Sequence, residues 1–226
     1  MPTDVDPFEP EVGAPEEAVM PDRLQRLFAW TWAAVTGSKI GFTVFVFVIY
    51  VLPYGLGLLA VTTQIRAGGD FVVLAFAALV ASTFASAQPA PTPTMGTLSM
   101  ILIGFLGAYF DPTTVTAIAT IAGVVGLIVS YGAGAAGIGR LIFERMQDRP
   151  AVVAAVERAF SVTREHGAWA ILVLTFVPNP AYAWSSVAMG ASRARFAPYI
   201  AAAVVGSGAR FAALAFLGAG IQNALG

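Results

Sequence analysis

The sequence predicts an all-α integral membrane protein with about three to four full spans, two re-entrant helical hairpins in an inverted repeat, and interfacial amphipathic helices. Three observations lead to this fold class. Of the 226 residues, 58% are hydrophobic and only 11% are charged, whereas soluble domains carry about 25% charged residues. Several apolar runs approach the length of about 20 residues that a span requires. Two others are broken by Pro-x-Pro elements, through which a helix cannot continue.

The first 39 residues are predicted to precede the membrane domain. Residues 1–21 are rich in acids and prolines and contain no Lys or Arg, so we expect a disordered acidic tail, with a docking tail as the alternative. Residues 22–39 open with Asp22 and Gln25 in the spacing of a helix capping box, and they carry two tryptophans suited to the headgroup level. This segment is predicted to be an interfacial helix.

Residues 40–226 are predicted to form a single membrane domain. The apolar run 40–61 is the first span, with a kink expected at Pro53. In 71–110, two apolar arms flank a polar, proline-rich break. The second arm is too short to cross the hydrocarbon core, so the segment is predicted to be a re-entrant hairpin with its tip inside the protein.

The second half of the domain repeats this pattern. A glycine-rich span is expected over 113–138, where the glycines favour close helix packing. The charged stretch 140–166 is predicted to contain a second interfacial helix. A second re-entrant hairpin is predicted over about 168–195, with Pro178-Asn179-Pro180 at its tip, and the final span follows over 197–220.

The distribution of basic residues predicts the orientation. Lys and Arg cluster before the first span, within 140–166 and at 193–195, whereas Arg66 falls on the other side. The positive-inside rule then places the N-terminus of a multi-pass protein in the cytoplasm, and we expect a bacterial cell membrane. The two hairpins would enter from opposite faces and form an inverted repeat, a design typical of transporters. The alternative is that the prolines only mark loops between spans.

A series of residues in the second part of the chain keeps a characteristic order and spacing. It comprises Pro91-Thr92-Pro93, Gly104, Gly123, Tyr131, Gly139-Arg140, His166-Gly167, Phe176-Val177-Pro178-Asn179-Pro180, Gly190, Phe196 and Gly218. Over roughly residues 70–220 this series resembles the DedA/VTT superfamily, also called the SNARE-associated Golgi protein domain. The resemblance implies two facing re-entrant helices and movement of lipids across the bilayer. Family members are regarded as scramblases, or as flippases for phospholipids and polyprenyl-phosphate carriers, some of them coupled to protons.

The chain departs from the family pattern at three positions. Many members have acids before and after the first Pro-x-Pro, where this chain has Ala87 and Met95. Many also have an Arg before the second Phe–Pro element, where this chain has Thr175. Because an intramembrane acid–arginine pair serves proton coupling and phosphate binding, the departures favour passive scrambling, or loss of activity, over coupled transport.

Arg210 is the first candidate site residue, because it lies near the middle of the last predicted span. An arginine at this depth costs at least about 2.5 kcal/mol, so its side chain should face the interior or water. It is predicted to bind a phosphate headgroup, which suits guanidinium geometry. The equally weighted alternative is pairing with backbone carbonyls at a broken helix end.

The remaining substrate-binding candidates lie at the hairpin tips and at one span end: Asn179, Pro91, Pro93, Pro178, Pro180 and Arg140. Asn179 could bind a headgroup or only satisfy the broken backbone around it. For Arg140 the end of a span favours a simple snorkelling anchor over a binding role. Asp111 is expected to be an N-cap, and His166 to be a helix-terminal cap rather than a pH sensor.

Composition excludes several kinds of function. The chain has no Cys and one His, so no metal site is expected, and no cofactor is predicted. A net charge of −1 gives no basic face for nucleic acid. Hydrolase, metalloprotease and nucleotide-binding motifs are absent, so the protein is not expected to be an enzyme.

The sequence therefore leaves two main hypotheses. The first is a scramblase or flippase-like transporter of the DedA/VTT type, whose partners are membrane lipids. The second is a non-transporting scaffold or auxiliary subunit of a larger membrane protein complex. A homo-oligomer is possible in either case. An ion or small-molecule transporter ranks third, because it requires a more polar centre than the sequence indicates.

Overall fold

The computed structural model describes residues 26, 55, 71–88, 94–137, 150–177 and 182–225. The predicted acidic tail 1–21 lies outside the described residues. Arg26 and Gly55 are helical, but the rest of the predicted interfacial helix 22–39 and of the first span 40–61 lies outside them as well.

The described residues are almost entirely helical and contain no strand, which confirms the all-α class. The helices are α4 (Phe71–Ser86), α5 (Thr94–Tyr109), α6 (Pro112–Ala135), α8 (Pro150–His166), α9 (Ala168–Phe176), α10 (Tyr182–Ala191) and α11 (Phe196–Leu225).

Helix length divides these elements into two groups. α6 has 24 residues and α11 has 30, and both are long and apolar enough to cross a membrane. α4 and α5 have 16 residues each, or about 24 Å at 1.5 Å per residue. α9 and α10 have 9 and 10 residues, and each is only about 15 Å long. The four helices of the two predicted hairpins are therefore all shorter than the roughly 20 residues of a full span.

The start of α6 follows from three consecutive residue types. Asp111 is the N-cap: its carboxylate accepts hydrogen bonds from the backbone N–H and the hydroxyl of Thr114, both at 2.7 Å. Pro112 occupies the first turn, where a missing N–H has no cost. These hydrogen bonds lower the pKa of the Asp111 carboxyl, the Thr114 hydroxyl contributing most. The predicted N-cap role of Asp111 is confirmed.

α8 is amphipathic, as the sequence predicts. It begins at Pro150. Phe160 faces the bundle and is buried, whereas Glu157 and Arg158 are exposed. The chain then turns at Gly167, whose φ of +54° suits glycine, and enters α9 directly.

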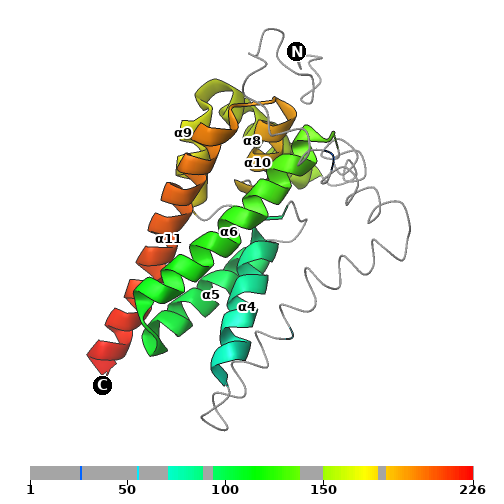
Figure 1. Ribbon diagram of the computed structural model, residues 1–226. Coiled ribbons are helices and arrows are strands. Elements are labelled where there is room, and N and C mark those ends of the chain that lie inside the picture. The colour runs from blue at the N-terminus through cyan, green and yellow to red at the C-terminus, as the bar shows by residue number, and fades with distance from the viewer. Residues whose placement is uncertain are drawn as a thin grey trace.

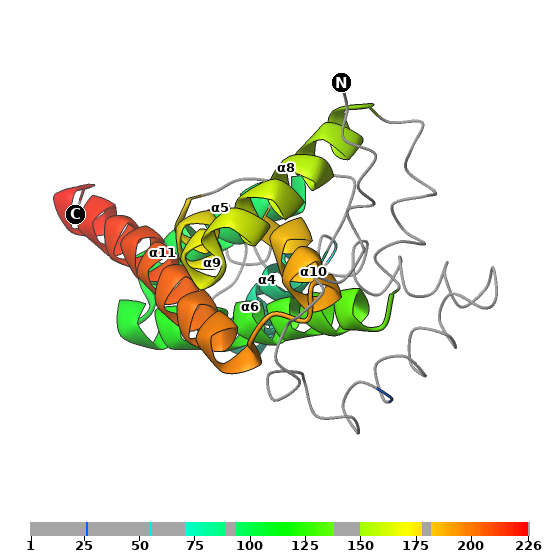
Figure 2. The same ribbon diagram turned by 90° about the horizontal axis from the view of Figure 1, so that it is seen from above.

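The short helices occupy opposite halves of the molecule. In Figure 1, α4 and α5 lie in the lower half and α8, α9 and α10 in the upper half, while α6 and α11 run through both. From above, α6 and α11 cross (Figure 2). α5 packs on α11 and α10 packs on α6, so each pair of short helices places one helix against the long helix that is more distant in the sequence.

Glycines bring the backbones of these helix pairs into direct contact. A methyl group at Gly218 of α11 would collide with the carbonyl oxygen of Gly104 in α5, and one at Gly190 of α10 with the carbonyl of Tyr131 in α6. Gly134 makes the same kind of contact with Val187. The prediction that α6 is a centre of close packing is confirmed at these positions. Gly137, by contrast, ends the helix with a φ of +76° and has no close neighbour.

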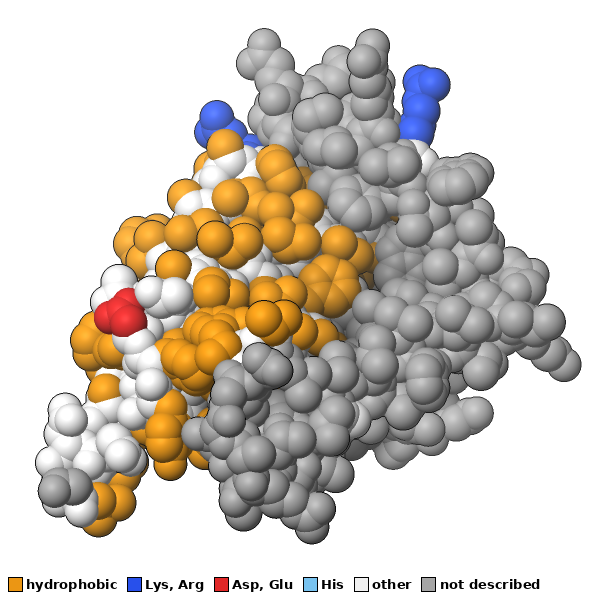
Figure 3. Space-filling model, turned by 60° about the horizontal axis from the view of Figure 1, so that its bottom comes forward, with side chains coloured by type: hydrophobic (Ala, Val, Ile, Leu, Met, Phe, Trp, Pro, Cys, Tyr) orange, Lys and Arg blue, Asp and Glu red, His pale blue; other side chains and the backbone are white. Residues whose placement is uncertain are grey.

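The outer surface of the bundle is apolar. Hydrophobic side chains cover most of the described face in Figure 3. Large exposed examples come from several helices: Val73, Ile101, Ile121, Trp169, Val173, Val205 and Leu217. Such a continuous apolar surface is unusual on a soluble monomer and suits contact with lipid chains.

Candidate functional site

Among the described residues, the one charged side chain buried at the centre of the bundle is Arg210 of α11. Only 7% of Arg210 is exposed, so it faces the interior as predicted. Its Cζ atom lies 5.1 Å from the ring centroid of Tyr182 and 4.7 Å from that of Phe211, within the range of cation–π contacts. Its Nε has no hydrogen-bond partner.

Tyr182 links Arg210 to the first hairpin. The Tyr182 hydroxyl donates to Ser86 Oγ at 3.0 Å, and Ser86 donates to the carbonyl of Thr83 at 2.8 Å. Tyr182 is the first residue of α10 and Ser86 is the last of α4. Tyr182 therefore connects the end of α4 to Arg210 of α11.

The end of α4 is also attached to α6. Ser130 donates to the carbonyl of Ala87 at 2.7 Å, and Gln88 Nε2 donates to the carbonyl of Gly126 at 3.0 Å. A methyl group at Gly126 would clash with Ala87, so only glycine permits this approach. These bonds hold the residues that directly precede the proline-rich segment 89–93 in the sequence.

Two further polar atoms of this region lack partners. Thr83 Oγ1 and Gln88 Oε1 are buried and, like Arg210 Nε, make no hydrogen bond. Most buried polar atoms in proteins are paired. Helix α6 lies beside all three residues. A methyl group at Gly123 would meet both Thr83 and Phe211, whose ring contacts Arg210, and the carbonyl of Gly126, one turn later, accepts the hydrogen bond from Gln88. We define Thr83, Ser86, Gln88, Tyr182 and Arg210 as the central polar cluster.

The sequence supplies no carboxylate to balance Arg210 from the helices around it. All Asp and Glu residues lie within 1–70, at 111 and within 144–165, so α4, α5, α6, α9, α10 and α11 contain none. The three acids among the described residues, Asp111, Glu157 and Glu165, are all exposed. The helices at the cluster therefore carry a net positive charge.

Thr175 lies where the packing admits no larger side chain. Its side chain is fully buried and its hydroxyl donates to the carbonyl of Ile171 at 2.7 Å. It packs so closely on Gly206 of α11 that even a methyl group at Gly206 would collide with it. The α9–α11 contact has no room for an arginine at residue 175.

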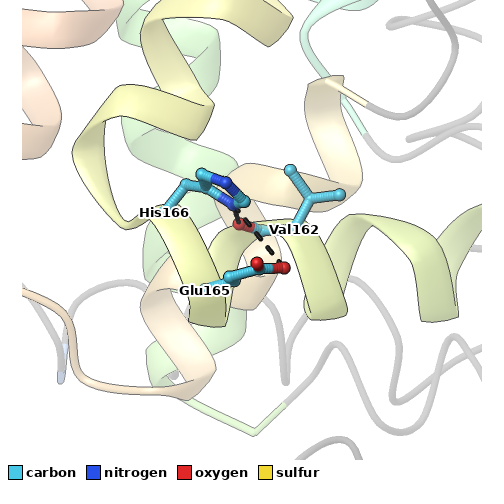
Figure 4. Close-up of polar contacts among 3 residues, drawn as sticks. All are labelled: Val162, Glu165 and His166. Carbon is cyan, nitrogen blue, oxygen red and sulfur yellow. Dashed lines mark hydrogen bonds and ion pairs between the residues drawn. The ribbon is translucent and has the colours of Figure 1, made fainter.

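His166 belongs to the surface and not to the cluster. It is the last residue of α8, and its Nδ1 lies 3.3 Å from the carbonyl oxygen of Val162 and 3.8 Å from a carboxylate oxygen of Glu165 (Figure 4). Its side chain is 55% exposed. This local contact at a helix end agrees with the predicted terminal role.

The other predicted site residues, Asn179, Pro91, Pro93, Pro178, Pro180 and Arg140, lie outside the described residues. The helices that flank both tips end where the prolines begin, at Ser86 and Phe176. Sequence reasoning missed Thr83, Ser86, Gln88 and Tyr182. The available signal was the run of hydroxyl residues at the end of an otherwise apolar arm, which makes the centre more polar than predicted.

Comparison with known proteins identifies the family. The VTT domain matches residues 92–220, more than half of the chain. This range begins at the first proline-rich tip and ends near the end of α11, and it includes Tyr182 and Arg210. No curated protein and no solved structure matches the chain. The VTT match agrees with the resemblance carried by the proline elements and by the glycines of the helix contacts, and the chain belongs to the DedA/VTT family of membrane proteins.

Proposed function

We propose that the protein is a scramblase or flippase-like transporter that moves phospholipid or lipid-phosphate headgroups across the bilayer. The observation that carries the proposal is the buried Arg210, whose guanidinium contacts Tyr182 of α10, the residue that hydrogen-bonds to the end of α4. A charge at this depth is expensive in an apolar bundle and typically marks a transport pathway.

The proposed topology is a multi-pass protein in a bacterial cell membrane with a cytoplasmic N-terminus. The exposed basic residues Arg158, Arg193 and Arg195 lie on α8 and at the turn between α10 and α11, in the upper part of Figure 1. Asp111 lies at the opposite end of α6 from this turn. By the positive-inside rule the upper end is the cytoplasmic one.

In this topology the short pairs α4–α5 and α9–α10 are re-entrant hairpins related by an inverted repeat. Their short helices, their positions in opposite halves and the reciprocal packing of α5 on α11 and α10 on α6 support this arrangement. The two segments also share a sequence spacing, because Gly104 precedes Phe110 by the same number of residues as Gly190 precedes Phe196. Substrate sites of such repeats lie where the broken helices meet, which is the position of the central polar cluster.

The chemistry of the cluster fits a phosphate headgroup. A guanidinium forms two parallel charge-assisted hydrogen bonds to phosphate oxygens, and the unpaired Nε of Arg210 is one available donor. The Thr83 hydroxyl, which makes no other hydrogen bond, can replace part of the water that a headgroup loses. The headgroup would cross through the bundle while its acyl chains remain in the lipid.

The test is a dithionite assay on vesicles that contain the purified full-length protein and a trace fluorescent phospholipid. The wild type should allow bleaching beyond the outer leaflet, and Arg210→Gln should slow it at least about tenfold, because one lost charge-assisted hydrogen bond is worth about 1.5–3 kcal/mol. Arg193→Gln is the matched control, because Arg193 is exposed at the α10–α11 turn. Equal rates for wild type and Arg210→Gln would refute the proposal.

A scaffold or auxiliary subunit of a larger membrane complex is the second candidate. The observation that favours it is the direct backbone contact at Gly104–Gly218 and Gly190–Tyr131, which packs α5 tightly on α11 and α10 tightly on α6. Purification from native membranes in mild detergent separates the candidates. A scaffold would elute with partner proteins, or as a homo-oligomer, and would move no lipid after reconstitution.

A further inference from the structure

We propose that the central polar cluster selects lipids whose headgroup is a net-anionic phosphate ester with an uncharged remainder, in preference to zwitterionic lipids. This inference rests on the proposed function, since it names the substrate class of the same site. Three independent observations carry it: the absence of acids from the surrounding helices, the occupation of both neighbouring rings, and the kinds of polar atoms left unpaired.

The first observation concerns charge. A zwitterionic headgroup carries an ammonium group beside its phosphate, and a buried ammonium needs a negative partner. No Asp or Glu occurs on α4, α5, α6, α9, α10 or α11. Arg210, of which only 7% is exposed, supplies only positive charge. An anionic headgroup neutralises this charge, whereas a zwitterion leaves the net charge unchanged.

The second observation concerns the aromatic rings. Proteins without a nearby carboxylate commonly bind ammonium groups over aromatic faces. Here Tyr182 and Phe211 already contact the guanidinium of Arg210, at 5.1 and 4.7 Å. An ammonium over either ring would come close to a like charge, so neither ring is available to bind it.

The third observation is the set of unpaired buried atoms. Arg210 Nε and the Thr83 hydroxyl are free donors, which a phosphate oxygen can satisfy. The Gln88 side-chain amide donates through its nitrogen to the carbonyl of Gly126, and its oxygen, Oε1, remains a free acceptor. This neutral acceptor suits a hydroxyl of the headgroup. Together the atoms match a phosphate ester that carries hydroxyls, as in a glycerol-phosphate headgroup.

The experiment compares two trace probes in identical host vesicles. Both probes carry the fluorophore on an acyl chain; one has a phosphatidylglycerol headgroup and the other phosphatidylcholine. Because the host composition is constant, only the probe's headgroup differs. The wild type should move the anionic probe at least about tenfold faster, the factor that corresponds to one unpaired charge-assisted hydrogen bond. Thr83→Val should reduce that preference, and Arg193→Gln should retain it.

A binding measurement separates this inference from the proposed function. Arginine-selective ¹⁵N labelling of the full-length protein in neutral detergent gives an Nε–H signal for Arg210, which Arg210→Lys assigns. Phosphatidylglycerol in the micelles should shift this signal, while phosphatidylcholine should not. Inorganic phosphate is titrated separately, up to the concentration used for phosphatidylglycerol. If phosphate shifts the Arg210 signal, the site binds free anions; if only phosphatidylglycerol shifts it, the ligand is the lipid headgroup.

The outcomes are distinguishable. If both probes move at the same rate, the selectivity is wrong while lipid transport stands. If neither probe moves but the Arg210 signal shifts with phosphatidylglycerol or phosphate, the anion site stands and the transport function is wrong. If no anion shifts the signal, the inference is overturned whatever the transport rates are.

Discussion

The hydroxyl of Tyr182 donates a hydrogen bond to Ser86 Oγ at 3.0 Å, although 96 positions separate the two residues. The bond joins the first residue of α10 to the last residue of α4, next to the buried guanidinium of Arg210. It is the most direct polar link between the two hairpins among the described residues, and its removal gives a sharp test of the central polar cluster.

Tyr182→Phe should weaken this link without removing the ring beneath Arg210. A net hydrogen bond contributes about 1 kcal/mol, so the variant should unfold at a lower temperature in detergent and should move lipid more slowly. Tyr109→Phe is the matched control, because that ring is 51% exposed near the other end of the bundle. Equal effects of both changes would contradict a role for the Tyr182–Ser86 bond.

Gly218→Ala should separate α5 from α11. The added methyl group would meet the carbonyl of Gly104, and overpacking of this kind costs about 1–3 kcal/mol. Thermal unfolding followed by tryptophan fluorescence measures the loss. Gly220→Ala lies on the same helix with open space around it, and it should be neutral or stabilising by up to about 1 kcal/mol because alanine is the better helix former. A Gly218→Ala variant as stable as Gly220→Ala would rule out the close α5–α11 contact.

Asp111→Ala should remove the N-cap of α6, with a pH-dependent effect. The pKa of Asp111 is lowered from 3.8, so its ionised carboxylate stabilises the folded state. This contribution is fully present above pH 3.8 and is lost as the pH falls through the lowered pKa. The stability difference between wild type and Asp111→Ala should therefore narrow below pH 3.8. Asp111→Asn keeps a capping oxygen without a charge, so its difference from Asp111→Ala should not change with pH.

Thr175→Arg should destabilise the protein, even though it restores a residue common in the family. Thr175 is fully buried against Gly206, so the larger charged side chain would force α9 away from α11 at a cost of at least about 2 kcal/mol. Size-exclusion chromatography in detergent should show a smaller monodisperse fraction. Thr175→Ser keeps the hydroxyl and has a side chain no larger than that of threonine, so this variant should behave like the wild type. A well-folded Thr175→Arg protein would show that the α9–α11 contact is looser than described.

The sequence predicts the helical elements well because their signals are local. Apolar runs and prolines locate α6, α11 and the interruptions at both tips, and the Asp–Pro pair locates the start of α6. The length of α11 is less well predicted. It extends to Leu225 rather than 220, because the small and polar residues of its last turns do not interrupt a helix already established by apolar packing.

The central polar cluster is harder to predict because its contacts are distant in sequence. The cost of a charge in mid-span predicts that Arg210 faces inward, but not which residues surround it. The pairing of Tyr182 with Ser86 depends on how α4 and α10 approach each other. Both helices pack on α6 through glycines, Gly126 against Ala87 and Gly134 against Val187, and the sequence does not specify the partners of these glycines.

The 30 residues of α11 give it a length of about 45 Å, whereas the hydrocarbon core of a bilayer is about 30 Å thick. To match this thickness, α11 must tilt strongly or thicken the bilayer at its flank, while the neighbouring short helix α9 favours a thinner one. The protein would thus be surrounded by a membrane of uneven thickness, thinnest beside the short helices. Acyl-chain length then becomes a control on rate: shorter chains reduce the distance that a headgroup travels, and longer chains extend it.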